Sequence, residues 1–181
     1  MRLRENGRRM RSFGPRGTQA FKRQQLAFVA PSGAIFLSNS HRGTLRVTRL
    51  RPSGRLDAGF GRVGTAVVRL PFSTGSLVEP VAADAKGRVL LAGFTRGSEA
   101  SRKGKGSDHF SLAIARLLPD GRIDNSFGEG GWVFSAVPKP LEVTSSTASI
   151  DSQGRLVLGA TVTAPGQPQG GYLLARYLLG P

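Results

Sequence analysis

The chain has 181 residues, of which 39% are hydrophobic, 25 are glycine and 11 are proline, and its formal charge is +15. This length suits one domain with a substantial core, and the glycine and proline content is typical of a turn-rich β protein. Because the chain has no cysteine, disulfides, thiolate nucleophiles and cysteine-ligated zinc are excluded. No apolar run reaches the ~18 residues of a membrane-spanning helix, and no apolar segment resembles the core of a signal peptide. The sequence therefore predicts no membrane span and leaves the cellular compartment unassigned.

The first 24 residues form a strongly basic segment. They contain eight lysines and arginines against the single carboxylate of Glu5, so this segment carries +7 and the rest of the chain carries +8. Few of its residues are apolar, which predicts a disordered tail over residues 1–24. Two interpretations stay open: the tail is an arm that binds phosphate groups, or it is a solvated leader without a binding role.

From residue 25 onward, short apolar segments alternate with Gly, Pro, Ser and Asp, which predicts many short strands and no helix. The turns after the first strand of each group contain Gly33, Gly87 and Gly154, and glycine permits the positive φ of a tight hairpin. The expected strands cover residues 25–30, 34–38, 44–50 and 64–70, then 77–83, 88–94, 110–117 and 131–136, and finally 147–150, 155–162 and 171–177.

The strand pattern repeats in three units, residues 25–76, 77–143 and 144–181. After their third strands, the first two units share a segment that runs from Pro52 to Gly61 and from Pro119 to Gly128; the third unit stops before it. Units of this size bury their apolar faces by stacking on one another, either as blades around a propeller axis or as a sandwich-like solenoid, and we favour the blades. The repeat predicts an all-β fold, a partial β-propeller of about 2.75 four-stranded antiparallel blades preceded by the disordered basic tail.

The second unit resembles the delta-60 repeat of bacterial, often secreted, propeller-like proteins. The resemblance rests on Lys-Gly-Arg-Val-Leu-Leu-Ala-Gly at 86–93, Ala-Arg-Leu at 115–117 and Pro-Asp-Gly-Arg-Ile-Asp-Asn-Ser-Phe-Gly at 119–128. The first unit departs from the pattern at Ala34, Asn39 and 58–59, and the third retains only 153–155 and 175–177. The resemblance implies a β-propeller-like fold, a role in binding or display, and secreted or cell-surface relatives. Because such relatives usually have more units and an export signal, it also suggests a fragment of a longer repeat protein.

Several residues recur once per unit, which favours structural over catalytic roles, because a catalytic group is needed only once per site. We expect the three recurring arginines to be braces that pair with Asp57 and Asp124 or with backbone groups, the phenylalanines to fill the core, and the glycines to form turns. These recurring positions are Arg49, Arg116, Arg176, Gly54, Gly121, Phe60 and Phe127.

The loop at residues 96–109 is the best candidate for a binding site, because it is basic and absorbs the insertions of the second unit. With the shorter loop of the first unit it forms a candidate polyanion-binding patch of Arg42, Arg96, Arg102, Lys103 and Lys105. The alternative is a flexible, solvated insertion. His41 and His109 could join Asp108 in a metal site, but the spacings typical of zinc are absent, so no metal is expected.

No pair of carboxylates stands out as an acid and a base, and no motif indicates a catalytic residue or a cofactor. We therefore expect a non-enzymatic repeat module that acts as a binding or display scaffold, with a protein partner or a second copy covering the faces of the terminal blades. Polyanion or nucleic-acid binding through the tail and loop 96–109 is one alternative. A propeller hydrolase or lyase with its site at the blade axis is the other.

Overall fold

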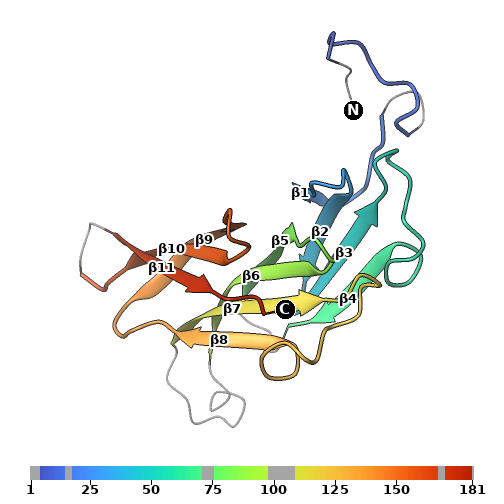
Figure 1. The fold of residues 1–181 in the computed structure, drawn as a ribbon. Helices are drawn as coiled ribbons and strands as arrows, with labels where there is room; N and C mark the ends of the chain where they lie inside the picture. The colour runs from blue at the N-terminus through green and yellow to red at the C-terminus, as the bar shows by residue number, and fades with distance from the viewer. Residues whose placement is uncertain (1–4, 15–17, 71–75, 98–108, 167–169, 181) are drawn as a thin grey trace.

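A computed structural model describes residues 5–14, 18–70, 76–97, 109–166 and 170–180. Within these residues the chain forms eleven strands and no helix, arranged as three antiparallel sheets (Figure 1). The strands are β1 (Gln25–Val29), β2 (Ile35–His41), β3 (Thr44–Leu50), β4 (Thr65–Arg69), β5 (Leu77–Ala83), β6 (Val89–Arg96), β7 (Phe110–Leu117), β8 (Trp132–Ala136), β9 (Glu142–Ile150), β10 (Leu156–Thr163) and β11 (Gly171–Tyr177).

Each predicted unit forms one sheet in which consecutive strands are neighbours. The orders are β1-β2-β3-β4, β5-β6-β7-β8 and β9-β10-β11. The predicted all-β class and the predicted groups of four, four and three strands are therefore confirmed. The hairpin glycines have φ of +80° at Gly33, +75° at Gly87 and +74° at Gly154, the left-handed region that favours glycine. The sheets stack in chain order, and the first strands β1, β5 and β9 contact one another in sequence.

The second sheet is covered on both faces by the sheets on either side of it. Successive residues of its strands point to opposite faces and therefore enter different cores. Leu91 and Ala113 belong to a core shared with the first sheet, whereas Leu90 and Ile114 belong to a core shared with the third. Every residue of β7 is buried. The two cores together make the second sheet the centre of the structure, with one apolar layer on each side.

The two outer sheets each leave one face open. On the third sheet Tyr172 is 86% exposed and Leu174 74%, and on the first sheet Val67 is 55% exposed. In the described part of the chain the third sheet ends at β11, whereas β3 and β7 each pair with a fourth strand. Within the described residues the third sheet therefore has an exposed apolar face and a strand edge without a neighbour.

Part of the basic segment for which we expect disorder contacts the first unit through Phe13. Its side chain is only 7% exposed and contacts Gly54, and the backbone N–H of Gly14 donates to the carbonyl of Ser53 at 2.9 Å. An apolar ring and a turn glycine tie this part of the basic segment to the first unit, so the net charge of the segment does not decide its structure. In the part of the chain that the structure describes, no helix is long and apolar enough to cross a membrane.

Gly121 and Gly154 allow a matched test of how closely the units approach. Both have positive φ, +86° and +74°, but a Cβ on Gly121 would lie 2.8 Å from the backbone nitrogen of Gly61, whereas a Cβ on Gly154 meets nothing within 4 Å. We expect Gly154→Ala to cost about 1 kcal/mol of unfolding free energy through backbone strain alone. Gly121→Ala should cost clearly more, because the first unit must also move. Urea denaturation measures both values, and equal losses would contradict the close approach.

Candidate functional site

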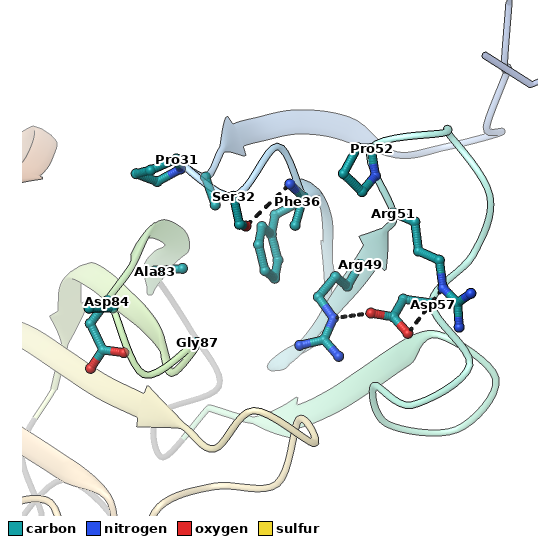
Figure 2. Close-up of a pocket in the computed structure, with 13 residues that line it drawn as sticks. Pro31, Ser32, Phe36, Arg49, Arg51, Pro52, Asp57, Ala83, Asp84 and Gly87 are labelled. Atoms are coloured by element: carbon teal, nitrogen blue, oxygen red, sulfur yellow. Dashed lines mark hydrogen bonds and ion pairs between the residues drawn. The ribbon is translucent and has the colours of Figure 1, made fainter. Parts of the chain in front are cut away.

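A pocket of about 630 Å³ lies at the junction of the first and second units. Figure 2 shows Phe36 between the turn at Pro31 and the pair of Arg49 with Asp57, and the turn at Asp84 on the opposite side. Its lining is mainly apolar, with Arg49, Arg51 and Asp57 on one side and Asp84 on the other. A second pocket, of about 410 Å³, is bordered by Pro31, Asp84 and Gly154, so turns from all three units meet there.

Arg49 forms the charged side of the first pocket and bridges two units. Its Nε lies 2.9 Å from a carboxylate oxygen of Asp57 as an ion pair, without the alignment of a hydrogen bond. Its guanidinium carbon lies 4.6 Å from the centre of the Phe60 ring, a cation–π contact. Its Nη1 donates to the backbone carbonyl of Pro119, in the next unit, at 2.7 Å. One side chain thus holds its own loop and the following unit together.

Arg116 repeats this arrangement one unit later and is more deeply buried. Its Nε donates to Asp124 at 2.7 Å, its guanidinium carbon lies 4.6 Å from the Phe127 ring centre, and its Nη1 donates to the carbonyl of Leu179 at 2.6 Å. The side chains of Arg116 and Asp124 are 6% and 8% exposed. The hydroxyl of Ser126 and the guanidinium of Arg116 donate to Asp124 and hold the pKa of its carboxyl below the usual value, against the effect of burial.

The third arginine has only part of this environment. Arg176 lies 4.0 Å from Asp151, and its side chain is 59% exposed. Among the described residues, the segment after β11 holds no aspartate or phenylalanine like those beside Arg49 and Arg116. The recurring position is therefore complete at the two internal junctions and open at the last sheet.

The other aspartates of the turns bond to the local backbone. Asp84 accepts from the N–H groups of Lys86 and Arg88, each at 2.9 Å. Asp151 accepts from the N–H groups of Gln153 and Arg155, and the backbone bond from Arg155 is the main cause of its lowered pKa. With their oxygens engaged in this way, these carboxylates act as turn-forming groups.

Of the predicted polyanion patch, the structure describes only the two residues at its edges. Arg42 lies in the hairpin between β2 and β3, and Arg96 ends β6 with its guanidinium carbon 5.7 Å from the Phe110 ring centre. Arg102, Lys103 and Lys105 lie outside the described residues, as does Asp108. Among the residues that are described, no group of three metal-ligating side chains is close enough to hold an ion.

A polar contact between the first and second units, centred on Glu79, was not predicted from the sequence. Glu79 on β5 accepts hydrogen bonds from the hydroxyl of Ser38 and, at 3.4 Å, from the side-chain amide of Gln25. These residues border a third, polar pocket at the start of β5. The only sequence signal is a carboxylate within the otherwise apolar strand Leu77–Ala83, and its partners depend on how the first two sheets stack.

Comparison with known proteins adds no assignment to this geometry. No protein-family model, curated protein or solved structure matches the chain.

The buried pair of Arg116 and Asp124 predicts a large stability effect. Asp124→Asn leaves a buried guanidinium without its counter-charge, so we expect a loss of about 3 kcal/mol in unfolding free energy. Asp120→Asn is the control, because the ion pair of Asp120 with Arg122 is solvent-exposed and should matter far less.

The same pair predicts an acid limit to stability. Because the folded-state pKa of Asp124 is lowered, its contribution is present above the unfolded-state pKa of about 3.9 and is lost as the pH falls through the lower folded value. Chemical denaturation at pH 7 and in steps below pH ~4 should show a smaller acid-induced loss for Asp124→Asn than for the parent. Parallel pH profiles for parent and variant would contradict this role.

Proposed function

We propose that the chain is a non-enzymatic β-propeller-type repeat module that acts as a binding or display scaffold. The observation that carries the proposal is that its conspicuous charged residues recur by unit and hold the fold together. Arg49 and Arg116 each link a loop to the next unit, and the turn aspartates are engaged by backbone N–H groups. These groups are needed for stacking, which leaves the clefts and loops between units as recognition surfaces.

The propeller part of the proposal is supported by the order of the sheets. Strands β1, β5 and β9 contact one another in sequence, as the inner strands of blades around an axis do. The turns of all three units border one pocket on this side. The delta-60-like pattern of the second unit agrees with this arrangement, and a protein partner or a second copy would cover the outer sheets.

The first pocket defines the chemistry of a suitable ligand. Its lining includes the apolar ring of Phe36 and, on the same side as Asp57, the side chain of Arg51, which is 62% exposed with its Nε 3.6 Å from Asp57. A ligand with an apolar group next to a carboxylate would match this combination, because the ring excludes water and the guanidinium favours an anion.

The enzyme alternative is tested with a panel of phosphate, carboxylate-ester, glycoside and uronide substrates. We expect no turnover above that of a matched preparation of Asp57→Asn, because this aspartate is neutralised by Arg49. Turnover by the parent that disappears in Asp57→Asn while both proteins retain the same circular-dichroism spectrum would overturn the scaffold proposal and favour a hydrolase or lyase.

Polyanion binding is the second candidate function, and the formal charge of +15 favours it. Each lysine that contacts a phosphate should contribute about 0.9 to the slope of log affinity against log salt on duplex DNA. We therefore expect the double variant Lys103→Ser with Lys105→Ser to reduce the magnitude of this negative slope by about 2, measured by fluorescence anisotropy on a labelled duplex. The control removes the same charge elsewhere, with Lys86→Ser and Lys139→Ser. Equal effects of the two double variants would show general charge attraction instead of a patch.

A further inference from the structure

The basic N-terminal segment contains a copy of the loop that follows the third strand in the first two units. We call residues 52–64 and 119–131 the closing loops, and residues 5–14 with 18–21 the N-terminal arm. The arm reads Asn-Gly-Arg at 6–8 and Ser-Phe-Gly at 12–14, and the second closing loop reads Asp-Gly-Arg at 120–122 and Ser-Phe-Gly at 126–128. The spacing between the two motifs is the same. Met10 stands where the closing loops have Asp57 and Asp124.

The backbone of the arm repeats that of the closing loops. The three Phe-Gly glycines, Gly14, Gly61 and Gly128, all have φ of +57°. The N–H of Phe13 donates to the carbonyl three residues earlier at 3.0 Å, and the N–H groups of Phe60 and Phe127 do the same at the same distance. The turn glycines Gly7, Gly54 and Gly121 have φ of +76°, +79° and +86°.

The arm also contacts the first unit as one closing loop contacts the next unit. The N–H of Gly61 donates to the carbonyl of Asp120 at 2.7 Å, and the N–H of Gly14 donates to the carbonyl of Ser53, the equivalent residue, at 2.9 Å. The ring of Phe60 packs against Gly121, and that of Phe13 packs against Gly54. The arm therefore occupies the place of the closing loop of a preceding unit.

The third unit presents the complementary half. Among the described residues its β11 edge has no fourth strand, the side chain of Arg176 is 59% exposed, and Tyr172 and Leu174 are exposed. Leu174 is equivalent to Val47 and Ile114, and Tyr172 is equivalent to Leu45 and Leu112. In the first two units these residues pack toward the following sheet. In Figure 1 the arm extends beyond the first sheet, at the opposite end of the stack from β9, β10 and β11.

We propose that two copies of this chain join head to tail, with the N-terminal arm of one copy completing the third sheet of the other. Residues 18–21 add to β11 as a fourth strand, Phe13 lies beneath Arg176, and the face with Tyr172 and Leu174 packs on the first sheet of the second copy. The inference rests on the repeat geometry and not on the binding role proposed above. It extends an interface that the chain already builds twice.

Arg176 has a counterpart for each partner of the internal arginines. Its acceptor in the second copy is the carbonyl of Pro52, equivalent to Pro119 and Leu179, and a carbonyl oxygen accepts two hydrogen bonds. The arm of the second copy has Met10 where the closing loops have an aspartate, so it supplies no carboxylate to Arg176. Asp151, in the same copy as Arg176, lies 4.0 Å from the Arg176 side chain and supplies one instead.

The strand register gives a test by disulfide formation. Thr65 pairs with Thr48, and Trp132 pairs with Ala115, so the equivalent residues Thr18 and Ala175 should face each other across the junction between copies. Directly opposed residues of antiparallel strands have the Cα separation that a disulfide requires. The chain has no cysteine, so a disulfide between Thr18→Cys in one copy and Ala175→Cys in another is unambiguous. The control is Leu174→Cys, whose side chain points to the opposite face.

We expect light scattering on the full chain to give at least twice the single-chain mass of 19.2 kDa, and Tyr172→Glu with Leu174→Glu to reduce it to one chain. Leu77→Glu, on an exposed site of the second sheet, should retain the parent mass.

A mixture of Thr18→Cys and Ala175→Cys chains should form the disulfide several times faster than a mixture of Thr18→Cys and Leu174→Cys chains.

A parent of single-chain mass at every concentration, or equal crosslinking of the two pairs, would overturn the proposal. Rapid crosslinking of Ala175→Cys with itself would also do so, because it would show two β11 edges pairing with each other.

Discussion

The structure depends on one constraint: a sheet with two apolar faces is stable only when another layer covers each face. The second sheet meets this condition, since Leu91 packs toward the first sheet and Leu90 toward the third. Burying these side chains contributes about 25 cal/mol per Å² of apolar surface, which no single sheet of this size can gain alone. The units therefore stabilise one another in series, and the outer sheets are the least protected parts of the stack.

The arginines fix the position of each sheet relative to the next one. A hydrophobic contact alone tolerates sliding, whereas Arg49 and Arg116 each reach a named backbone carbonyl in the next unit while held by an aspartate and an aromatic ring. The arginine is 16% exposed at the first junction, 6% at the second and 59% at the outer sheet. The two arginines that reach a following unit are the buried ones, whereas Arg176, with no following unit among the described residues, is exposed.

The strands and hairpins were predictable because the period of apolar residues and the turn glycines are local signals. The partners of Arg49 in its own loop were also accessible, since Asp57 recurs at a fixed spacing. Two features were not predictable in this way. The bond between Ser38 and Glu79 depends on how two sheets meet. The likeness of the arm to the closing loops was the second, because the arginines of the arm dominate its composition and Met10 replaces the aspartate of the motif, although Gly7 and Phe13 keep its spacing.

Native-state hydrogen exchange measures the central claim most directly, because it reports the stability of each strand separately. If stacking on both faces stabilises the second sheet, the amides of β6 and β7 that bond to each other will exchange slowest, and those of β2 and β10 will exchange faster. Exchange in β6 and β7 as fast as in β10 would show that each sheet is stable by itself and would contradict the account.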